Sequence, residues 1–233
     1  MKSLIKGFFY KIGYQISKIN KQASKMDIYL HKYKNYEEYK KVQIKFNKLK
    51  IDNVWADNAV LSCIVNFLKK NRESESKLFG LCHGSRNGYE QNYLAKEIGL
   101  PCKILGTDIS PTANKFSNSI VHDFHDQRKD WLNKMDFVYS NSLDQSFDPE
   151  RALSIWLAQV KVGGFLIIEL SLQHEPNGAS EMDPFGIKCE YFPYFLIKLF
   201  SHNVTIHIEN IKKSNGKGMA FIFFIKKVSD FVS

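Results

Sequence analysis

Several features that define common protein classes are missing from this sequence of 233 residues. No apolar run approaches the roughly 20 residues that a membrane-spanning helix needs. The four cysteines form no CxxC pair, which argues against a disulfide framework or a zinc site and favours buried thiols in a reducing compartment. Lys6 and Lys11 interrupt the apolar N-terminus, and no small-residue cleavage site follows, so a signal peptide is not indicated. We therefore expect a cytoplasmic globular protein.

Three short motifs of well-known enzyme classes are absent as well. A glycine turn is present in CHGSRNG, but no GK[ST] follows it, which excludes a P-loop. The turn is not GxSxG, so it is not a nucleophile elbow. It also lacks the GxGxxG pattern of dinucleotide-binding proteins. Its interpretation therefore depends on the segments around it.

Acidic residues are scarce in the first 50 positions, which contain 13 lysines and three acidic residues, a net charge of +10. The whole chain carries +9, so everything after residue 50 sums to −1. Because a nucleic-acid enzyme usually carries its basic surface around its cleft, this distribution disfavours nucleic acid as a substrate. The lysines are more simply a solvated helix face, and contact with an anionic membrane surface is the second interpretation.

The N-terminal third is expected to be helical. Apolar residues at helical spacing predict an amphipathic helix over 3–20, which could pack on its own domain, on a partner or on lipid. Two further helices are predicted over 36–49 and 56–70. We describe residues 1–76 as an N-terminal helical extension, ending in the polar run NRESESK.

Strands and helices alternate in the main domain, residues 77–233, which predicts a mostly parallel sheet with helices on both faces. Residues 171–189 hold no periodic pattern and suggest an active-site loop, so 171–200 is assigned to a substrate loop and helix. The expected strands are 77–82, 103–107, 120–121, 136–140 and 165–170, followed by an antiparallel pair at 203–211 and 218–226; the expected helices lie around 88–98, from Pro149 onwards, and around 190–201.

The glycine turn stands between a short apolar run and a helical pattern, in FGLCHGSRNGYE at residues 79–90. A carboxylate, Asp108, follows 24 residues after Gly84 at the end of the next predicted strand. In a βαβ unit, glycine lets the backbone approach a ligand and an acidic residue at this distance binds ribose hydroxyls. This layout predicts a nucleoside site.

From about residue 77 to 227 the chain resembles class I S-adenosylmethionine-dependent methyltransferases. The resemblance rests on four landmarks in order: the glycine turn, Asp108 in GTDIS, the Asp of HDF, and SNSLDQSFDPERAL leading to KVGGFLIIE. The last block is the most specific. The resemblance implies a Rossmann-like α/β fold with seven strands that ends in an antiparallel hairpin, with S-adenosyl-L-methionine as cofactor.

The sequence departs from the family pattern at the glycine turn. The acidic residue that usually precedes the turn is absent, with Phe79 or Gly80 near its place. Two of the three family glycines are replaced, by Cys82 and Arg86, which leaves Gly84. The cofactor's ammonium group would then need another acceptor.

The resemblance implies roles for individual residues. Asp108 would accept hydrogen bonds from the ribose, and Asp123 with Phe124 would flank the adenine, although an Asp and a Phe there fit a turn and a core position equally well. His83 and Arg86 would orient the cofactor carboxylate, and Arg86 could instead meet a phosphate on the substrate. The full set of expected cofactor contacts is Cys82, His83, Gly84, Arg86, Asp108, Ile109, Asp123, Phe124, Ser140, Asn141 and Ser142.

Methyl transfer to a hydroxyl benefits from a general base that removes the acceptor's proton. His174, just after the fifth strand, is the first candidate, and Asp144 and Glu175 are the alternatives. Each of the three could also be an ordinary loop residue. The segment HDFHD contains imidazole and carboxylate groups, but its spacing and the adenine role of Asp123 argue against a metal site, so we expect no metal.

The sequence therefore predicts a methyltransferase that acts on oxygen in a small molecule. The short segment KIGYQIS resembles N-termini of bacterial surface-glycan enzymes, including sugar methyltransferases, which favours a sugar, a sugar phosphate or a related capsule precursor as acceptor. One alternative is a nucleic-acid methyltransferase, against which stands the absence of NPPY or DPPY after the fourth strand. The other is a methyltransferase-like binding protein without catalysis, which the altered glycine turn would suit.

Overall fold

A computed structural model describes residues 23–71, 77–99, 101–214, 216 and 218–230. The helix expected over 3–20 lies outside these ranges, as does most of the polar run that follows residue 71. Within the described chain, no helix is long and apolar enough to cross a bilayer.

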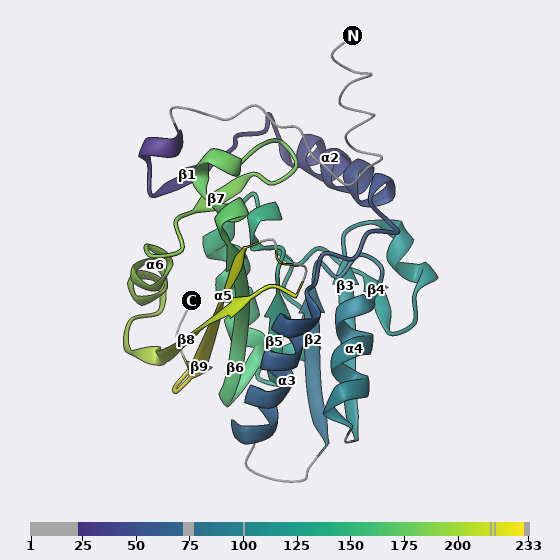
Figure 1. Ribbon diagram of the computed structural model, residues 1–233. Helices are drawn as coiled ribbons and strands as arrows, with labels where there is room; N and C mark the ends of the chain where they lie inside the picture. Colours follow the sequence, from purple (N-terminus) through teal and green to yellow (C-terminus); the bar gives the residue numbers. More distant parts are fainter. Residues whose placement is uncertain (1–22, 72–76, 100, 215, 217, 231–233) are drawn as a thin grey trace.

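A seven-stranded sheet forms the centre of the molecule, with strand order β4-β3-β2-β5-β6-β9-β8 (Figure 1). Neighbouring strands from β4 to β6 are parallel. The expected α/β fold with a mostly parallel sheet is confirmed. The strands are β2 (Leu78–His83), β3 (Cys102–Asp108), β4 (Ser119–Val121), β5 (Met135–Ser140), β6 (Val160–Ser171), β8 (Val204–Lys212) and β9 (Met219–Lys227).

The C-terminal hairpin completes the sheet. β9 lies between β6 and β8 and is antiparallel to both, with Ile167 opposite Phe224 and Ile206 opposite Ile225. This is the antiparallel ending that the turn KKSNGKG predicted.

Helices cover both faces of the sheet, as Figure 1 shows. α3 (Asn58–Asn71) and α4 (Tyr89–Ile98) pack on one face, in an apolar cluster that includes Ile64, Leu94 and Phe137. α5 (Pro149–Gln159) and α6 (Phe192–Phe200) pack on the other, in a cluster that includes Trp156, Leu196 and Val138. Phe137 and Val138 are adjacent on β5 and face opposite clusters, because successive strand side chains alternate between faces.

The start of α5 follows from its sequence. Asp148 is the N-cap, and its carboxylate accepts the backbone N–H of Arg151 at 3.2 Å. Pro149 takes the first helical position, where its missing N–H costs nothing. The predicted cap and start are confirmed.

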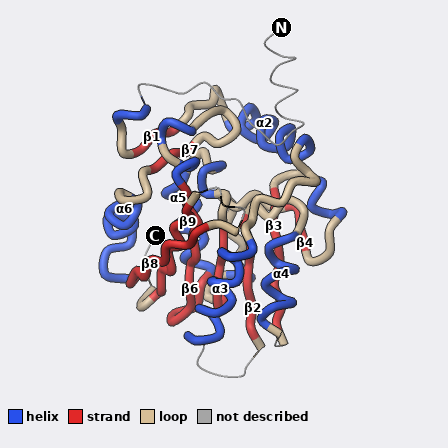
Figure 2. Tube along the Cα trace, viewed as in Figure 1, coloured by secondary structure: helices blue, strands red, loops and turns tan. Residues whose placement is uncertain are grey.

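The segment before α3 crosses the carboxyl end of the sheet. α2 (Tyr36–Leu49) has the bounds expected from the sequence and lies beside the loops that gather there (Figure 2). β1 (Ile28–Leu30) pairs with β7 (Phe185–Ile187) in a small antiparallel sheet, which the sequence did not predict. Short 3-10 helices lie at Ala23–Lys25, Pro111–Lys115, Lys129–Trp131, Leu143–Gln145, Leu172–His174, Pro176–Gly178 and Ser201–Asn203.

Candidate functional site

The order of the strands reverses between β2 and β5, because the chain builds outward from β2 to β3 and β4 and then returns to β5 and β6. In open α/β sheets, ligands bind in the crevice at the carboxyl ends of the strands at such a reversal. Gly84, Asp108 and Asn141 lie at or just after the ends of β2, β3 and β5. We call this place the crevice.

The glycine turn has three residues with left-handed backbone at alternate positions: Gly84 (φ +73°), Arg86 (φ +39°) and Gly88 (φ +79°). A Cβ at Gly84 would lie 2.5 Å from the Cβ of Ser142, so no side chain fits there. The register differs from the one inferred from the sequence. Gly88 belongs to the turn, and of the three positions with left-handed backbone only Arg86 carries a side chain.

Asp108 is 8% exposed, and each of its carboxylate oxygens accepts one backbone N–H. Ser110 donates to Oδ1 at 2.8 Å and Arg86 donates to Oδ2 at 3.2 Å. Burial raises the pKa of Asp108, while these backbone donors, the charge of Arg86 and the side chain of Asn47 oppose the rise. Since a carboxylate oxygen accepts more than one hydrogen bond, both retain capacity for a hydroxyl.

α2 roofs the crevice with polar side chains. Tyr39, Gln43 and Asn47 are buried and four residues apart, so they share the inner face of the helix. Asn47 Oδ1 accepts the hydroxyl of Thr112 at 2.7 Å. Lys50, directly after α2, also lines the cavity, whose free volume is about 30 Å³. The sequence analysis missed these residues; the signal was a polar stripe on what would otherwise be the apolar face of a helix.

The adenine candidates lie at one end of the same crevice. Phe124 and Ile109 line the cavity. Asp123 accepts hydrogen bonds from the hydroxyl of Tyr36 on α2 and from Nδ1 of His125, both at 2.7 Å. Burial alone would raise the pKa of Asp123, but the donors His125 and Tyr36 outweigh it and hold the pKa at about 2.

His125 also contacts the hydroxyl of Ser146, at 2.7 Å from Nε2. The order Asp123–His125–Ser146 is that of a serine hydrolase triad. Ser146 is fully buried, however, and its oxygen accepts the backbone N–H of Asp148. The chain of hydrogen bonds therefore has a structural role and no accessible nucleophile. Among the described residues, no group of three His, Cys, Asp or Glu side chains could hold a metal ion.

Three expected cofactor contacts lie inside the protein. Cys82 packs in the apolar cluster beneath α3 and α4. His83 contacts Thr107 Oγ1 and Gln159 Oε1, both at 2.8 Å, and burial lowers its pKa to about 3. Ser140 donates to the backbone oxygen of His83 at 3.0 Å. The bond from Ser140 joins β5 to β2, and the side chain of His83 joins β2 to β3 and to α5.

Asn141 and Ser142 stand next to the glycine turn. The hydroxyl of Ser142 lies 3.3 Å from the backbone oxygen of Gly84 and 3.2 Å from Oδ1 of Asn141. These contacts fix the segment after β5 against the turn, at the bottom of the crevice.

The structure brings together two of the three candidate bases. Asp144 Oδ2 and His174 Nε2 are 3.7 Å apart, and both side chains are mostly buried. Asp144 Oδ1 and His174 Nδ1 are buried without a hydrogen-bond partner in the described part of the chain. Buried polar atoms are normally paired with protein, water or a ligand, so these two atoms make the Asp144–His174 pair the candidate place for an acceptor.

Burial sets the protonation of this pair. It raises the pKa of Asp144 to about 7, although the charge of Lys50 opposes the rise. It lowers the pKa of His174, although the charge of Glu169 opposes the fall. The imidazole is therefore neutral near pH 7 and the carboxyl is close to its midpoint. Attraction between the two groups would shift both values the other way, so desolvation outweighs it here.

Glu175, the third candidate, has a different environment. Its backbone oxygen accepts the N–H of Gly178, and its charge acts on Cys189 and Lys188. Within the described ranges, no hydrogen bond or ion pair connects its side chain to Asp144 or His174.

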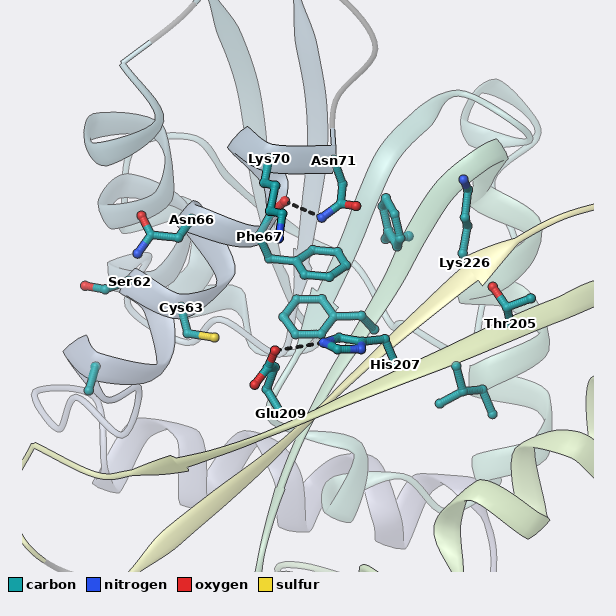
Figure 3. A pocket seen from close by; sticks show the side chains of 14 residues that line it. Ser62, Cys63, Asn66, Phe67, Lys70, Asn71, Thr205, His207, Glu209 and Lys226 are labelled. Atoms are coloured by element: carbon teal, nitrogen blue, oxygen red, sulfur yellow. Dashed lines mark hydrogen bonds and ion pairs between the residues drawn. The ribbon is translucent and has the colours of Figure 1, made fainter.

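A larger groove, of about 880 Å³, runs between α3 and the strands β8 and β9 (Figure 3). The ring of Phe67 stacks on Phe224 with centroids 3.7 Å apart, and His207 contacts Glu209 at 2.8 Å. None of the crevice residues lines it. We therefore assign the functional site to the crevice.

No model of a known protein family and no curated protein matches the sequence. Solved structures do match. A Burkholderia thailandensis 1,6-didemethyltoxoflavin-N1-methyltransferase, with bound 1,6-didemethyltoxoflavin and S-adenosylhomocysteine, gives a TM-score of 0.64 at 12% identity over 85% of this chain and 92% of that one. A methyltransferase from Aquifex aeolicus gives 0.51 at 14% identity over 83% and 99%. The fold is that of a class I methyltransferase.

A third similar structure shows what the class I methyltransferase fold leaves open. The [4+2]-cyclase SpnF gives a TM-score of 0.56 at 14% identity, over 76% of this chain and 86% of that one. One fold thus carries different reactions, and function has to be argued from the site.

Proposed function

We propose that this protein is an S-adenosylmethionine-dependent methyltransferase that methylates an oxygen of a small-molecule acceptor. The observation that carries the proposal is a site with two parts, the crevice and the Asp144–His174 pair, on which the charges of Lys50 and Arg86 at the cavity wall act through Asp144. Gly84, where no side chain fits, and the Asp108 carboxylate form the first part, and the unpaired Asp144 and His174 atoms form the second.

The residues of the first part suit the nucleoside of this cofactor. Asp108 has two acceptor oxygens for the ribose hydroxyls, and Gly84 allows the backbone close to the ligand. Phe124 and Ile109 supply apolar surface for the adenine. A nucleoside needs more room than about 30 Å³, so we propose that binding widens the cavity by an outward movement of α2.

The cofactor would supply a methyl group activated by a sulfonium, and the protein would position the acceptor and accept its proton. His174 Nε2 faces the Asp144 carboxylate, so a proton on Nε2 leaves the lone pair of Nδ1 free. Nδ1 would take the proton of the acceptor hydroxyl as a general base. The Asp144 carboxylate would stabilise the imidazolium that results.

A sugar or sugar phosphate is the acceptor class we propose. The resemblance of KIGYQIS to glycan enzymes supports a sugar. Lys50 and Arg86 supply positive charge at the wall of the cavity, which supports a phosphate on the sugar.

The four free cysteines suit a reducing compartment such as the cytoplasm. Peripheral membrane contact through residues 3–20 is part of the same proposal.

A transfer assay tests the reaction. Cofactor with a labelled methyl group is incubated with the protein and a panel of sugars and sugar phosphates, and label is sought in each acceptor. Label in one acceptor, lost in His174→Ala, is the expected result. Cofactor binding without transfer to any hydroxyl compound would favour the non-catalytic alternative. Tight RNA binding with a steep salt dependence would favour the nucleic-acid alternative.

A further inference from the structure

Glu90 lies in the first turn of α4, immediately after the glycine turn, and is 7% exposed. Its Oε2 atom is buried and has no hydrogen-bond partner among the described residues. An unpaired buried carboxylate oxygen is costly, because neither water nor a donor replaces its lost hydration. None of the roles assigned above uses this group.

The neighbours of Glu90 place it beneath the turn, between the ends of β2 and β5. The Asn141 side chain and the charge of Arg86 both act on its carboxyl group and oppose the rise that burial causes in its pKa. Burial, and then the charge of Glu90, raise the pKa of the Cys82 thiol. Glu90 therefore lies close to Cys82, near the end of β2.

Glu169 is a second buried carboxylate near Glu90, and it shows the difference between a paired and an unpaired group. Tyr139 donates its hydroxyl to Glu169 Oε2 at 2.8 Å, and Lys213 Nζ lies 3.3 Å from Oε1. Both oxygens of Glu169 thus have partners within the protein.

Burial raises the pKa of Glu90 to about 7, against the opposing effects of its own backbone N–H and Arg86.

We infer that the Glu90 carboxylate binds the α-ammonium group of the amino-acid portion of S-adenosylmethionine. The inference rests on the proposed function and extends it to a residue that the sequence analysis did not select. A primary ammonium has three donors and a full positive charge, so it satisfies Oε2 and offsets the cost of a buried anion. The acceptor missing from the strand before the turn is supplied by the helix after it.

Two ligands and two variants test this role. S-adenosylhomocysteine carries the amino-acid portion, whereas 5′-methylthioadenosine has the same nucleoside and sulfur without it. Glu90→Gln keeps the shape of the side chain and removes its charge. Glu97→Gln is the matched control, since Glu97 is an exposed residue of the same helix.

Calorimetric titration should show S-adenosylhomocysteine bound about 10- to 100-fold more weakly by Glu90→Gln, the loss expected for a hydrogen bond between charged groups. Binding of 5′-methylthioadenosine should change by less than about twofold. Glu97→Gln should match the wild type for both ligands. Equal losses for both ligands in Glu90→Gln would show a structural role and overturn the inference, as would unchanged binding of S-adenosylhomocysteine.

Proton release provides a second readout. An ammonium beside Glu90 lowers the pKa of the carboxyl, so binding near pH 7 releases protons in the wild type and fewer in Glu90→Gln. Titrations in buffers of different ionisation enthalpy measure this difference, and equal release from both proteins would contradict the inference. The proposed function fails separately, if the wild type binds neither ligand.

Discussion

Asp144 and His174 derive their chemistry from burial. Each would be an ordinary charged or titrating side chain in water, but the crevice raises one pKa and lowers the other. The result at neutral pH is an uncharged imidazole next to a carboxyl that readily takes or gives a proton. Matched groups of this kind are typical of acid–base sites.

This pair predicts a pH profile. If the Asp144 carboxylate stabilises the protonated His174, then kcat/KM should rise as the pH passes through about 7, the pKa of Asp144. His174→Ala should lower kcat by roughly 10²- to 10⁴-fold and leave cofactor affinity unchanged. His202→Ala, at an exposed position, should behave as the wild type. A rate that is flat from pH 6 to 8 would refute the role of Asp144.

Asp123 predicts how acid affects stability. Its pKa is lowered from 3.8 to about 2 in the folded protein, so it stabilises the fold above pH 4 and loses that contribution as the pH falls toward 2. Asp123→Asn should therefore reduce the free energy of unfolding by roughly 2 kcal/mol at pH 7 and by much less at pH 2 to 3. Denaturant titrations at both pH values, with the exposed Asp52→Asn as control, measure this. A deficit that stays constant with pH would contradict the assignment.

At the scale of elements, α2 and the small β1–β7 sheet connect the N-terminal segment to residues 181–188. Tyr33 donates to the backbone oxygen of Glu181 at 2.6 Å, and Gln43 donates to that of Met182 at 2.9 Å. Lys188 forms an ion pair with Asp27 at 2.7 Å. The roof of the crevice is therefore assembled from two distant parts of the chain.

α2 should act as the movable part of this roof. Its outer end is held by the hydrogen bond from Tyr36 to Asp123, which Tyr36→Phe removes while keeping the ring contact with Phe147. Loss of this hydrogen bond should destabilise the position of α2 over the crevice by about 0.5–1.5 kcal/mol. Amide exchange in residues 36–49 should accelerate about 2- to 13-fold, with little change in α5. Exchange at the wild-type rate would show that this bond does not hold the helix.

The sequence predicted the strands and helices well, but it predicted neither the β1–β7 pairing nor the role of α2 over the crevice. The predicted helix over 36–49 matches α2 to the residue, and the predicted Asp148 cap marks the start of α5. Three-residue strands such as β1 and β7 carry no pattern, and their pairing joins residues more than 150 positions apart. A function for α2 was not predicted, because amphipathic analysis treats polar residues such as Gln43 as solvent-facing.

The candidate site divides in the same way. Asp108, Asp144 and His174 follow strand ends, so topology and motif order selected them as candidates. Their pairing was not predicted: Asp144 and His174 were separate alternatives, and the structure places them 3.7 Å apart. Glu90 was missed, since a glutamate in the first turn of a helix is common and only its burial and unpaired oxygen distinguish it.

At the scale of the whole molecule, the proposed contacts lie at the carboxyl ends of the parallel strands, where the strand order reverses beside β2. The similar solved structures share this architecture at 12–14% identity. The proposed function therefore requires that the crevice at the carboxyl ends of the strands binds the nucleoside through Asp108.

Calorimetric titration of S-adenosylhomocysteine into wild-type protein and Asp108→Ala tests this claim directly. The account predicts one site per chain in the wild type and a loss of roughly 1.5–3 kcal/mol of binding free energy in the variant. Asp52→Asn, at an exposed position, should bind as the wild type does. No binding by the wild type at millimolar ligand, or equal affinity for wild type and Asp108→Ala, would contradict it.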